Sequence, residues 1–361
     1  MASHSRRKLL ARIRHRCATV HCSLRCVRRS FLFGRDPVSG TDYSHRRDWI
    51  MIREEQLASL FAIDIEFRSE MRNHLHVVLR TCPRIADRLS SYEVARRWLT
   101  ITKIAKCQSD AMPVPDPKKV EELAKDKKRI KKLRGRLTDI SWFMGILAEN
   151  IARRANTEDD CRGRFWESRF KCRECADPSA ILLCAIYVDL NPMKAGEVDS
   201  PETARYTSVF QRLQAQFQPA DAVDRVDGWM AELTLAPENK ANEALAYSSR
   251  TGRRATDMGI LPITLEVYVD LLKRTGELLR SGERTTIPHD LAAILERMEV
   301  NHEAWLETLE NFEELFGQVV GSASSVAQAA EEMGVSRLKG SAAGARVFRA
   351  CGKAQSPVNA A

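Results

Sequence analysis

The sequence lacks three features, and each absence excludes a class of protein. It has no apolar run approaching the roughly 18–20 residues that a membrane-spanning helix needs, so we expect a soluble protein. It has no glycine-rich P-loop signature, and its basic start, MASHSRRKLLARIRHR, leads into no apolar stretch of the secretory kind. We find no internal repeat. The 361 residues, 44% of them apolar, are enough for one large or two modest domains with true cores.

Acidic residues are absent from residues 1–35, which carry Arg6, Arg7, Lys8, Arg12, Arg14, Arg16, Arg25, Arg28, Arg29 and Arg35. A second basic run, KKVEELAKDKKRIKKLRGR, covers residues 118–136, and the net charge is +9. Such blocks favour a polyanionic partner through counterion release. A solvated tail and a solvated helix are the alternative explanation.

The ten cysteines are scattered through a long chain, which favours a reducing cytoplasm over a disulfide framework. Cys172 and Cys175 form a CxxC pair, with Cys161, Cys22 and Cys26 as further zinc ligands to consider. No second close pair follows at finger-like spacing, so structural zinc is not the favoured interpretation.

The periodicity predicts alternating strands and helices over about the first 200 residues. Strands are expected near 17–34 and 62–80, and helices over 46–61, 84–107, 137–156 and 177–191. This order predicts an α+β domain with a small antiparallel sheet and helices packed on it, followed by an all-helical C-terminal region. The predicted divisions are a basic flexible arm (1–16), a main domain (17–215) with a basic helical insertion (109–136), a linker (216–256) and a helical region (257–361). Residues near 324–348 also carry a possible helix-turn-helix pattern, for which plain packing helices are the alternative.

Two short motifs could carry chemistry. In MRNHLHVVLR (71–80), a strand would place His74 and His76 on one face, where two imidazoles can hold a divalent metal. In YVDLNPMKAG (187–196), Tyr187 and Asn191 lie four residues apart on one helix face, although Pro192 leaves the direction of Asn191 open. Taken singly, each motif has a simpler explanation: chance histidines on a half-exposed strand, and a core tyrosine.

Taken together, the motifs resemble the REP-associated tyrosine transposases, which are insertion-sequence-200-like members of the single-tyrosine HUH superfamily. The resemblance runs in order through RCVRRSFLFG (25–34), MRNHLHVVL (71–79), GRFWESRFK (163–171) and YVDLNPMKAG (187–196), about half of the chain. Arg72 departs from the motif, which more often has proline or a small residue there. Acidic Glu66 and Glu70 are also unusual so close to a site for DNA phosphate.

The resemblance implies a fold, a reaction and a set of residues. The fold would be HUH-endonuclease-like, of the ferredoxin or RRM type. His74, His76 and Asn191 would hold Mg²⁺ or Mn²⁺, and Tyr187 would cut single-stranded DNA at hairpin-forming repeats through a 5′-phosphotyrosine link. The link conserves the phosphodiester energy, so rejoining needs no ATP. A homodimer is also implied, and the predicted DNA-binding residues are Arg25, Arg28, Arg29, Arg164, Trp166, Arg169 and Lys171.

Two other functions fit the same residues. One is a catalytically silent DNA-binding protein that recognises repeat hairpins through the basic residues. The other is a metal-dependent hydrolase in which Tyr187 is an ordinary core residue. The nuclease hypothesis requires the Tyr187 hydroxyl to approach the His74/His76 pair.

Overall fold

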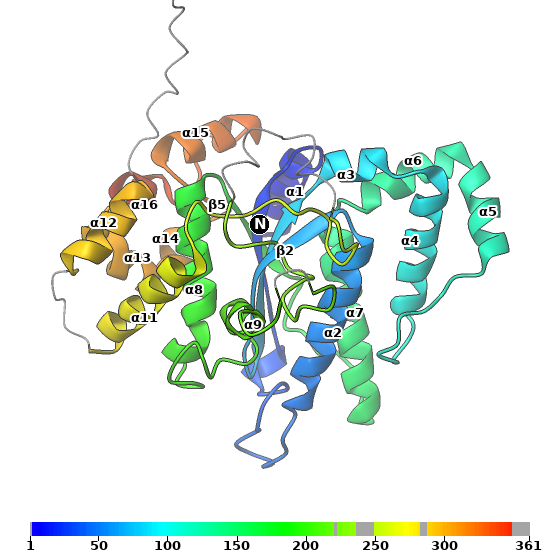
Figure 1. Cartoon of the computed structure of the whole chain (residues 1–361), viewed down its shortest axis with the longest axis horizontal. Coiled ribbons are helices and arrows are strands. Elements are labelled where there is room, and N and C mark those ends of the chain that lie inside the picture. Colours follow the sequence, from blue (N-terminus) through cyan, green and yellow to red (C-terminus); the bar gives the residue numbers. More distant parts are fainter. Residues whose placement is uncertain (1, 220–221, 236–248, 282–286, 349–361) are drawn as a thin grey trace, which may run out of the picture.

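The structure, a computed structural model, describes residues 2–219, 222–235, 249–281 and 287–348, without the side chains of residues 2–5 and of Arg29. A central sheet is covered by helices on both faces (Figure 1). Its strands are β1 (Thr19–Arg25), β2 (Ile63–Glu70), β3 (His74–Thr81), β4 (Lys171–Cys175) and β5 (Val319–Val320).

The strand order is β2-β3-β1-β4-β5. The first four strands pair antiparallel, whereas β5 pairs parallel with β4 at Glu174 and Cys175. The α+β class is therefore confirmed, but the prediction of a purely antiparallel sheet is wrong, because β5 comes from the C-terminal region. That region is accordingly not all helical.

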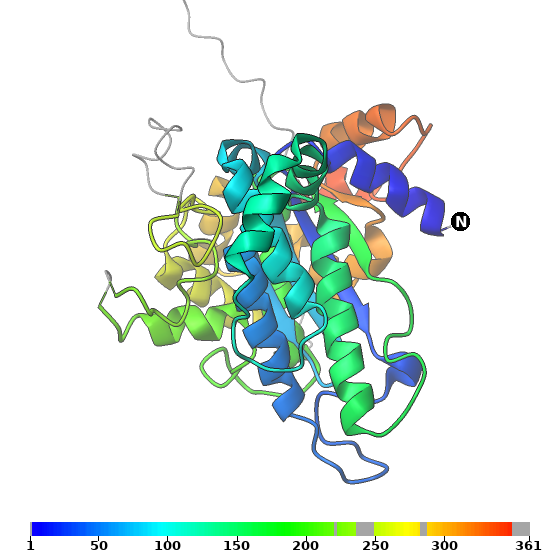
Figure 2. The ribbon, with the colours of Figure 1, turned by 90° about the vertical axis from the view of Figure 1, so that its right-hand side faces the viewer.

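The apolar residues that alternate along β3 lie on one face of the sheet. Leu75, Val77 and Leu79 are fully buried there. Burial of each side chain stabilises the folded state by about 1.5–3 kcal/mol relative to an exposed position. The helices on this side are α1 (Ala2–Ile13), α2 (His45–Leu60), α3 (Pro83–Arg88), α4 (Ser91–Ile104), α5 (Pro117–Lys125), α6 (Lys127–Arg136), α7 (Ile140–Glu158) and α15 (Ala323–Glu332). Figure 2 shows the long α7 beside α2 from this side.

The other face carries His74 and His76 and is covered by α8 and the C-terminal helices (Figure 1). These elements are α8 (Pro178–Lys194), α9 (Ser208–Ala215), α11 (Leu265–Ser281), α12 (His289–Arg297), α13 (Trp305–Glu310), α14 (Phe312–Leu315) and α16 (Ser341–Val347). Two short 3-10 helices, η1 (Val27–Arg29) and η2 (His302–Ala304), complete the described elements.

Helix α8 begins as the sequence predicts. Asp177 is its N-cap and accepts a hydrogen bond from the amide of Ala180 at 2.9 Å, with Pro178 at the first helical position. The helix does not end at Asn191, however, but continues to Lys194. Pro192 is tolerated because it lies in the last turn, where it removes one amide donor without interrupting a long helix.

Residues 2–13 of the predicted flexible arm form a helix, α1. In α1, Leu9 and Ile13 are buried, and the guanidinium of Arg12 pairs with Glu174 of β4. Basic side chains of this segment therefore lie on a helix that packs against β4.

The predicted linker is packed as well. Within its described residues, Trp229 is buried under the guanidinium of Arg68, and the amide of Ala231 donates to the Ile65 carbonyl at 2.8 Å. The possible helix-turn-helix consists of α15 and the short α16, joined by residues 333–340. Val347 and Phe348 are buried at its end, in keeping with a packing role for these helices.

Candidate functional site

Two neighbouring strands bring three histidines together. His74 and His76 lie two residues apart on β3, with ring centroids 4.9 Å apart. His21 of β1 is in register with Val78, and its ring is nearly parallel to that of His76, with centroids 5.0 Å apart. Its Nε2 lies 2.8 Å from His76 Nδ1, so the two imidazoles share a buried hydrogen bond.

Helix α8 places Tyr187 over this histidine cluster. The Tyr187 ring meets His76 edge-on, with centroids 5.7 Å apart, and His21 at 6.0 Å. Asn191, one turn further on, donates from Nδ2 to the Tyr187 carbonyl at 3.0 Å. The residues predicted as metal ligands and nucleophile therefore lie in one place, although α8 is far from β3 in the sequence.

The hydrogen bonds of the histidines leave nitrogens available for a divalent cation. The Nδ1 atom of His74 donates to Asn73 Oδ1 at 2.6 Å, and His76 Nδ1 is occupied by His21. In both His74 and His76, Nε2 is therefore the nitrogen that these two hydrogen bonds do not use. In metal sites, a ligating histidine is usually oriented by a hydrogen bond to its other ring nitrogen. Asn191, the third predicted ligand, has its side chain beside Tyr187 and would offer its amide oxygen.

This donor set suits Mg²⁺ or Mn²⁺ only in part. Within the described ranges, no group of three or more His, Cys, Asp or Glu side chains has the arrangement of a metal site. Two imidazoles and one amide oxygen make an incomplete shell, which substrate phosphate oxygens and water would have to complete. The residues present fit a cation that binds together with a phosphate.

Burial keeps the histidines neutral. It lowers the pKa of His21 from 6.5 to about 3, with a smaller contribution from Arg173. It also lowers the pKa of His74 to about 4, helped by Arg25 and opposed by Glu313, and lowers that of His76 well below its usual value. Neutral imidazoles are the form that ligates metals.

A pH prediction follows for His21. Because its folded pKa lies below its unfolded value, the unfolded chain takes up a proton below pH 6.5 that the folded chain does not. Stability is therefore lost as pH falls towards 3. His21→Gln should make the fall in unfolding free energy between pH 6 and 4.5 shallower by up to about 1.4 kcal/mol per pH unit in urea titrations. Exposed His289→Gln is the control, and equal slopes in His21→Gln and wild type would contradict the prediction.

Tyr187 is enclosed rather than free. Only 8% of it is exposed, and its ring stacks on Phe312 of α14 at 4.3 Å. Burial raises the pKa of the Tyr187 phenol, as does nearby Glu313, whereas Arg173 and the Asn191 side chain act in the opposite direction. The phenol is therefore held protonated in this state.

The predicted DNA-binding residues divide between the two faces of the sheet. Arg25 is in register with His74, and Lys171 with Ser23, so both lie on the histidine face. The ammonium of Lys194 lies 6.0 Å from the Tyr187 ring centroid on the same side.

Arg164, Trp166 and Arg169 line a different surface, between α1 and α7. Arg28 is exposed in η1, and the Arg29 side chain lies outside the described residues. The structure thus gathers only part of the predicted basic set around Tyr187.

Glu66 and Glu70, the two acidic residues that are unusual for the motif, do not face the histidines. Glu70 lies on the opposite face, where it pairs with buried Arg68. Glu66 lies at the far end of the strands, 3.1 Å from Arg80. Neither carboxylate occupies the space beside His74.

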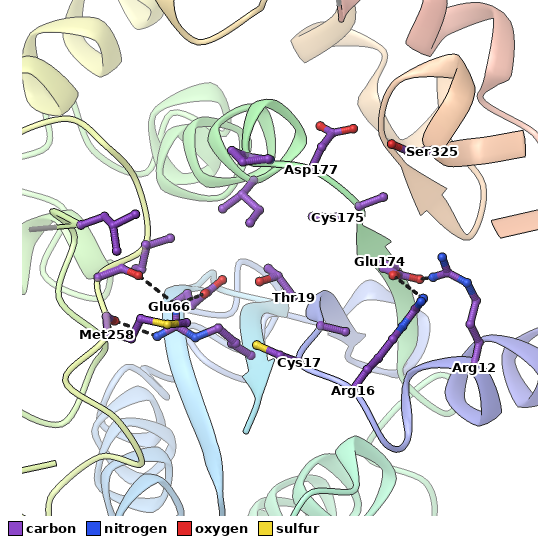
Figure 3. Close-up of a pocket in the computed structure, with 18 of the residues that line it drawn as sticks. Arg12, Arg16, Cys17, Thr19, Glu66, Glu174, Cys175, Asp177, Met258 and Ser325 are labelled. Carbon is purple, nitrogen blue, oxygen red and sulfur yellow. Dashed lines mark hydrogen bonds and ion pairs between the residues drawn. The ribbon is translucent and has the colours of Figure 1, made fainter. Parts of the chain in front are cut away.

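A cavity of about 440 Å³ lies at that far end, between α1, the start of α8 and α15 (Figure 3). Glu66, Cys17 and Thr19 lie on one side, and Glu174 is held between Arg12 and Arg16 on the other. The cavity contains none of His74, His76 or Tyr187, so it is separate from the histidine cluster.

The cysteines in the described part of the chain do not form a zinc site. Cys172 and Cys175 are three residues apart on β4, so their side chains point to opposite faces. Cys172 is instead directly opposite Cys22 of β1.

His21, Arg173 and Phe312 are site residues that the sequence analysis missed. His21 stands in an alternating run that is readable as a strand, but its place beside His76 depends on the register between β1 and β3. Phe312 comes from the C-terminal region, and no motif links it to Tyr187.

Comparisons of this chain with protein-family models, with curated proteins and with solved structures found no match. No helix among the described residues combines the length and apolar character needed to cross a membrane.

Proposed function

We propose that this protein cuts and rejoins single-stranded DNA at hairpin-forming repeats, with Tyr187 as the nucleophile. One observation carries the proposal: the ring of Tyr187 from α8 lies 5.7 Å, between centroids, from His76, one of the two histidines that β3 places on one face. An HUH-type nuclease needs this juxtaposition, and a core tyrosine does not. Because both groups belong to the same chain, the centre does not need a second subunit to assemble, and the implied homodimer remains a prediction.

The chain's own residues supply the nucleophile and position the phosphate. In the proposed reaction, a bond forms between Tyr187 Oη and phosphorus as the bond from phosphorus to the 3′ oxygen breaks. The phenol loses a proton and the leaving 3′ oxygen gains one, so the step is a balanced transesterification. Arg25 and Lys171 would neutralise the flanking phosphates.

His74, His76 and Asn191 would hold the cation. A bound Mg²⁺ or Mn²⁺ would supply Lewis-acid stabilisation of charge on the phosphate oxygens. His21 acts indirectly, because its hydrogen bond engages Nδ1 of His76 and leaves Nε2 as the ring nitrogen that would ligate the cation.

The test is an adduct assay. The full chain is incubated with end-labelled, hairpin-bearing single-stranded DNA and Mn²⁺, and then run on a denaturing gel. A covalent band supports the proposal. Binding without a band assigns the silent DNA-binding function, and Mn²⁺-dependent cleavage without a covalent band assigns the hydrolase.

Metal affinity gives an independent prediction. His21→Asn removes the outer partner of His76, and Mn²⁺ affinity should fall about 10–100-fold, measured by Mn²⁺ paramagnetic resonance in the presence of DNA. His302→Asn, which changes a histidine of η2, is the control. Unchanged Mn²⁺ affinity in His21→Asn would argue against a cation at His76.

A further inference from the structure

A groove of about 880 Å³ lies on the sheet face opposite the histidines. Its walls are α1, α7 and the segment 164–170. The floor is apolar and includes Leu10, Leu24 and Met144. The groove thus combines a basic helix with the aromatic-basic segment that the sequence singled out.

The rim of this groove is mainly cationic. It carries Arg6, Arg7, Arg164 and Arg169, against the two carboxylates of Glu149 and Glu167. Glu149 is already paired with Arg153. Among the described residues, Arg7, Arg164 and Arg169 are exposed and have no ion-pair partner, so their charge is available to a ligand.

Aromatic rings are fixed beside these cations. Trp166 is held by a hydrogen bond from its Nε1 to the Ala148 carbonyl at 2.8 Å. Phe170 lies under the guanidinium of Arg6, whose Nη1 also donates to the Phe170 carbonyl at 2.9 Å. Arginines beside fixed rings over an apolar floor suit a chain of phosphates with unpaired bases better than they suit an acidic peptide.

The ends of β1 and β4 carry neighbouring residues on both faces of the sheet. Leu24 lines the groove, whereas the next residue, Arg25, is in register with His74 on the other face. Phe170 lines the groove in the same way, and Lys171 follows on the histidine face. Since β5 pairs only with Glu174 and Cys175, no described strand pairs with the first residues of β4 on that side.

We propose that this groove binds a single-stranded DNA segment that continues around the open end of β4 to the Tyr187 centre. The inference rests on the proposed function and extends it: the DNA strand is bound on one face of the sheet and cut on the other. The arginines contact phosphates, and the floor and rings contact bases without reading their sequence.

The test is a binding titration that needs neither metal nor cleavage. The full chain is titrated into a labelled oligothymidylate of about twenty nucleotides, followed by fluorescence anisotropy at several salt concentrations. The double variant Arg164→Ala/Arg169→Ala should bind roughly tenfold more weakly at low salt, and the salt slope should fall by about 1.4, as expected for two lost phosphate contacts. The matched control is Lys131→Ala/Lys132→Ala, which removes two exposed cations from α6.

Three results would overturn the inference. The first is wild-type affinity in the groove variant, and the second is an equal loss of affinity in the α6 control, which would indicate diffuse charge. Competition by polyglutamate as strong as that by unlabelled DNA would assign the groove to an acidic protein partner. Because the titration does not depend on adduct formation, a failed adduct assay leaves its result intact, and the two proposals fail separately.

Discussion

Replacement of Tyr187 by phenylalanine should abolish the covalent protein–DNA adduct. The substitution removes only the phenolic oxygen and keeps the ring, which stacks on Phe312 at 4.3 Å and meets His76 edge-on. The fold and DNA affinity should therefore survive, while adduct yield falls to below roughly a thousandth of the wild-type value, as when a covalent nucleophile is removed. Denaturing gels with labelled hairpin DNA and Mn²⁺ measure the adduct, and anisotropy on the same samples measures binding.

The matched control is Tyr92→Phe. Tyr92 lies in α4, on the side of the sheet opposite the histidines, with 45% of its surface exposed. Its variant should form adduct as wild type does. An adduct that persists in Tyr187→Phe and disappears in Tyr92→Phe would remove Tyr187 from the reaction. An adduct that persists in both would place the nucleophile on another residue.

Replacement of Arg68 by methionine should produce the largest loss of stability. Arg68 is fully buried, and its guanidinium pairs with Glu54 of α2 at 2.6 Å and with Glu70 of its own strand. The variant leaves two carboxylates buried without their cation, at a cost of about 3–5 kcal/mol. Urea unfolding should show a lower midpoint with an unchanged m-value.

The mechanism of this loss can be tested separately. Burial raises the pKa of both Glu54 and Glu70, so protonation at lower pH should reduce the deficit of Arg68→Met relative to wild type. The triple variant Arg68→Met/Glu54→Gln/Glu70→Gln, which removes all three charges, should recover most of the stability. Arg96→Met, which breaks a half-exposed pair with Glu93, should cost less than about 1 kcal/mol. An equal loss in Arg96→Met and Arg68→Met would contradict the role of the buried charges.

The sequence predicted the elements that depend on local pattern. The strand at His74, the helix that begins at Asp177 and the α+β class all follow from periodicity and capping, which act over a few residues. The pairing of His74 with His76 on one face also follows, because side chains alternate along a strand.

Local pattern failed where packing at long range decides the conformation. The arm at residues 1–16 carries dense positive charge, yet α1 forms because Leu9 and Ile13 find apolar partners and Arg12 finds Glu174. Within the described residues of the predicted linker, Trp229 packs beneath Arg68, a residue far away in the sequence.

What the sequence determined by itself is therefore which chemical groups exist and on which element each one lies: two histidines on a strand, and a tyrosine and an asparagine on a helix. Only the tertiary structure decided that Tyr187 lies beside His76, that His21 supports that ring, and that Phe312 covers the phenol. The physical reason is that these contacts are set by strand register and by the packing of α8 and α14 on the sheet. The free energies of that register and packing are summed over many distant residues, and none of the motifs contains them.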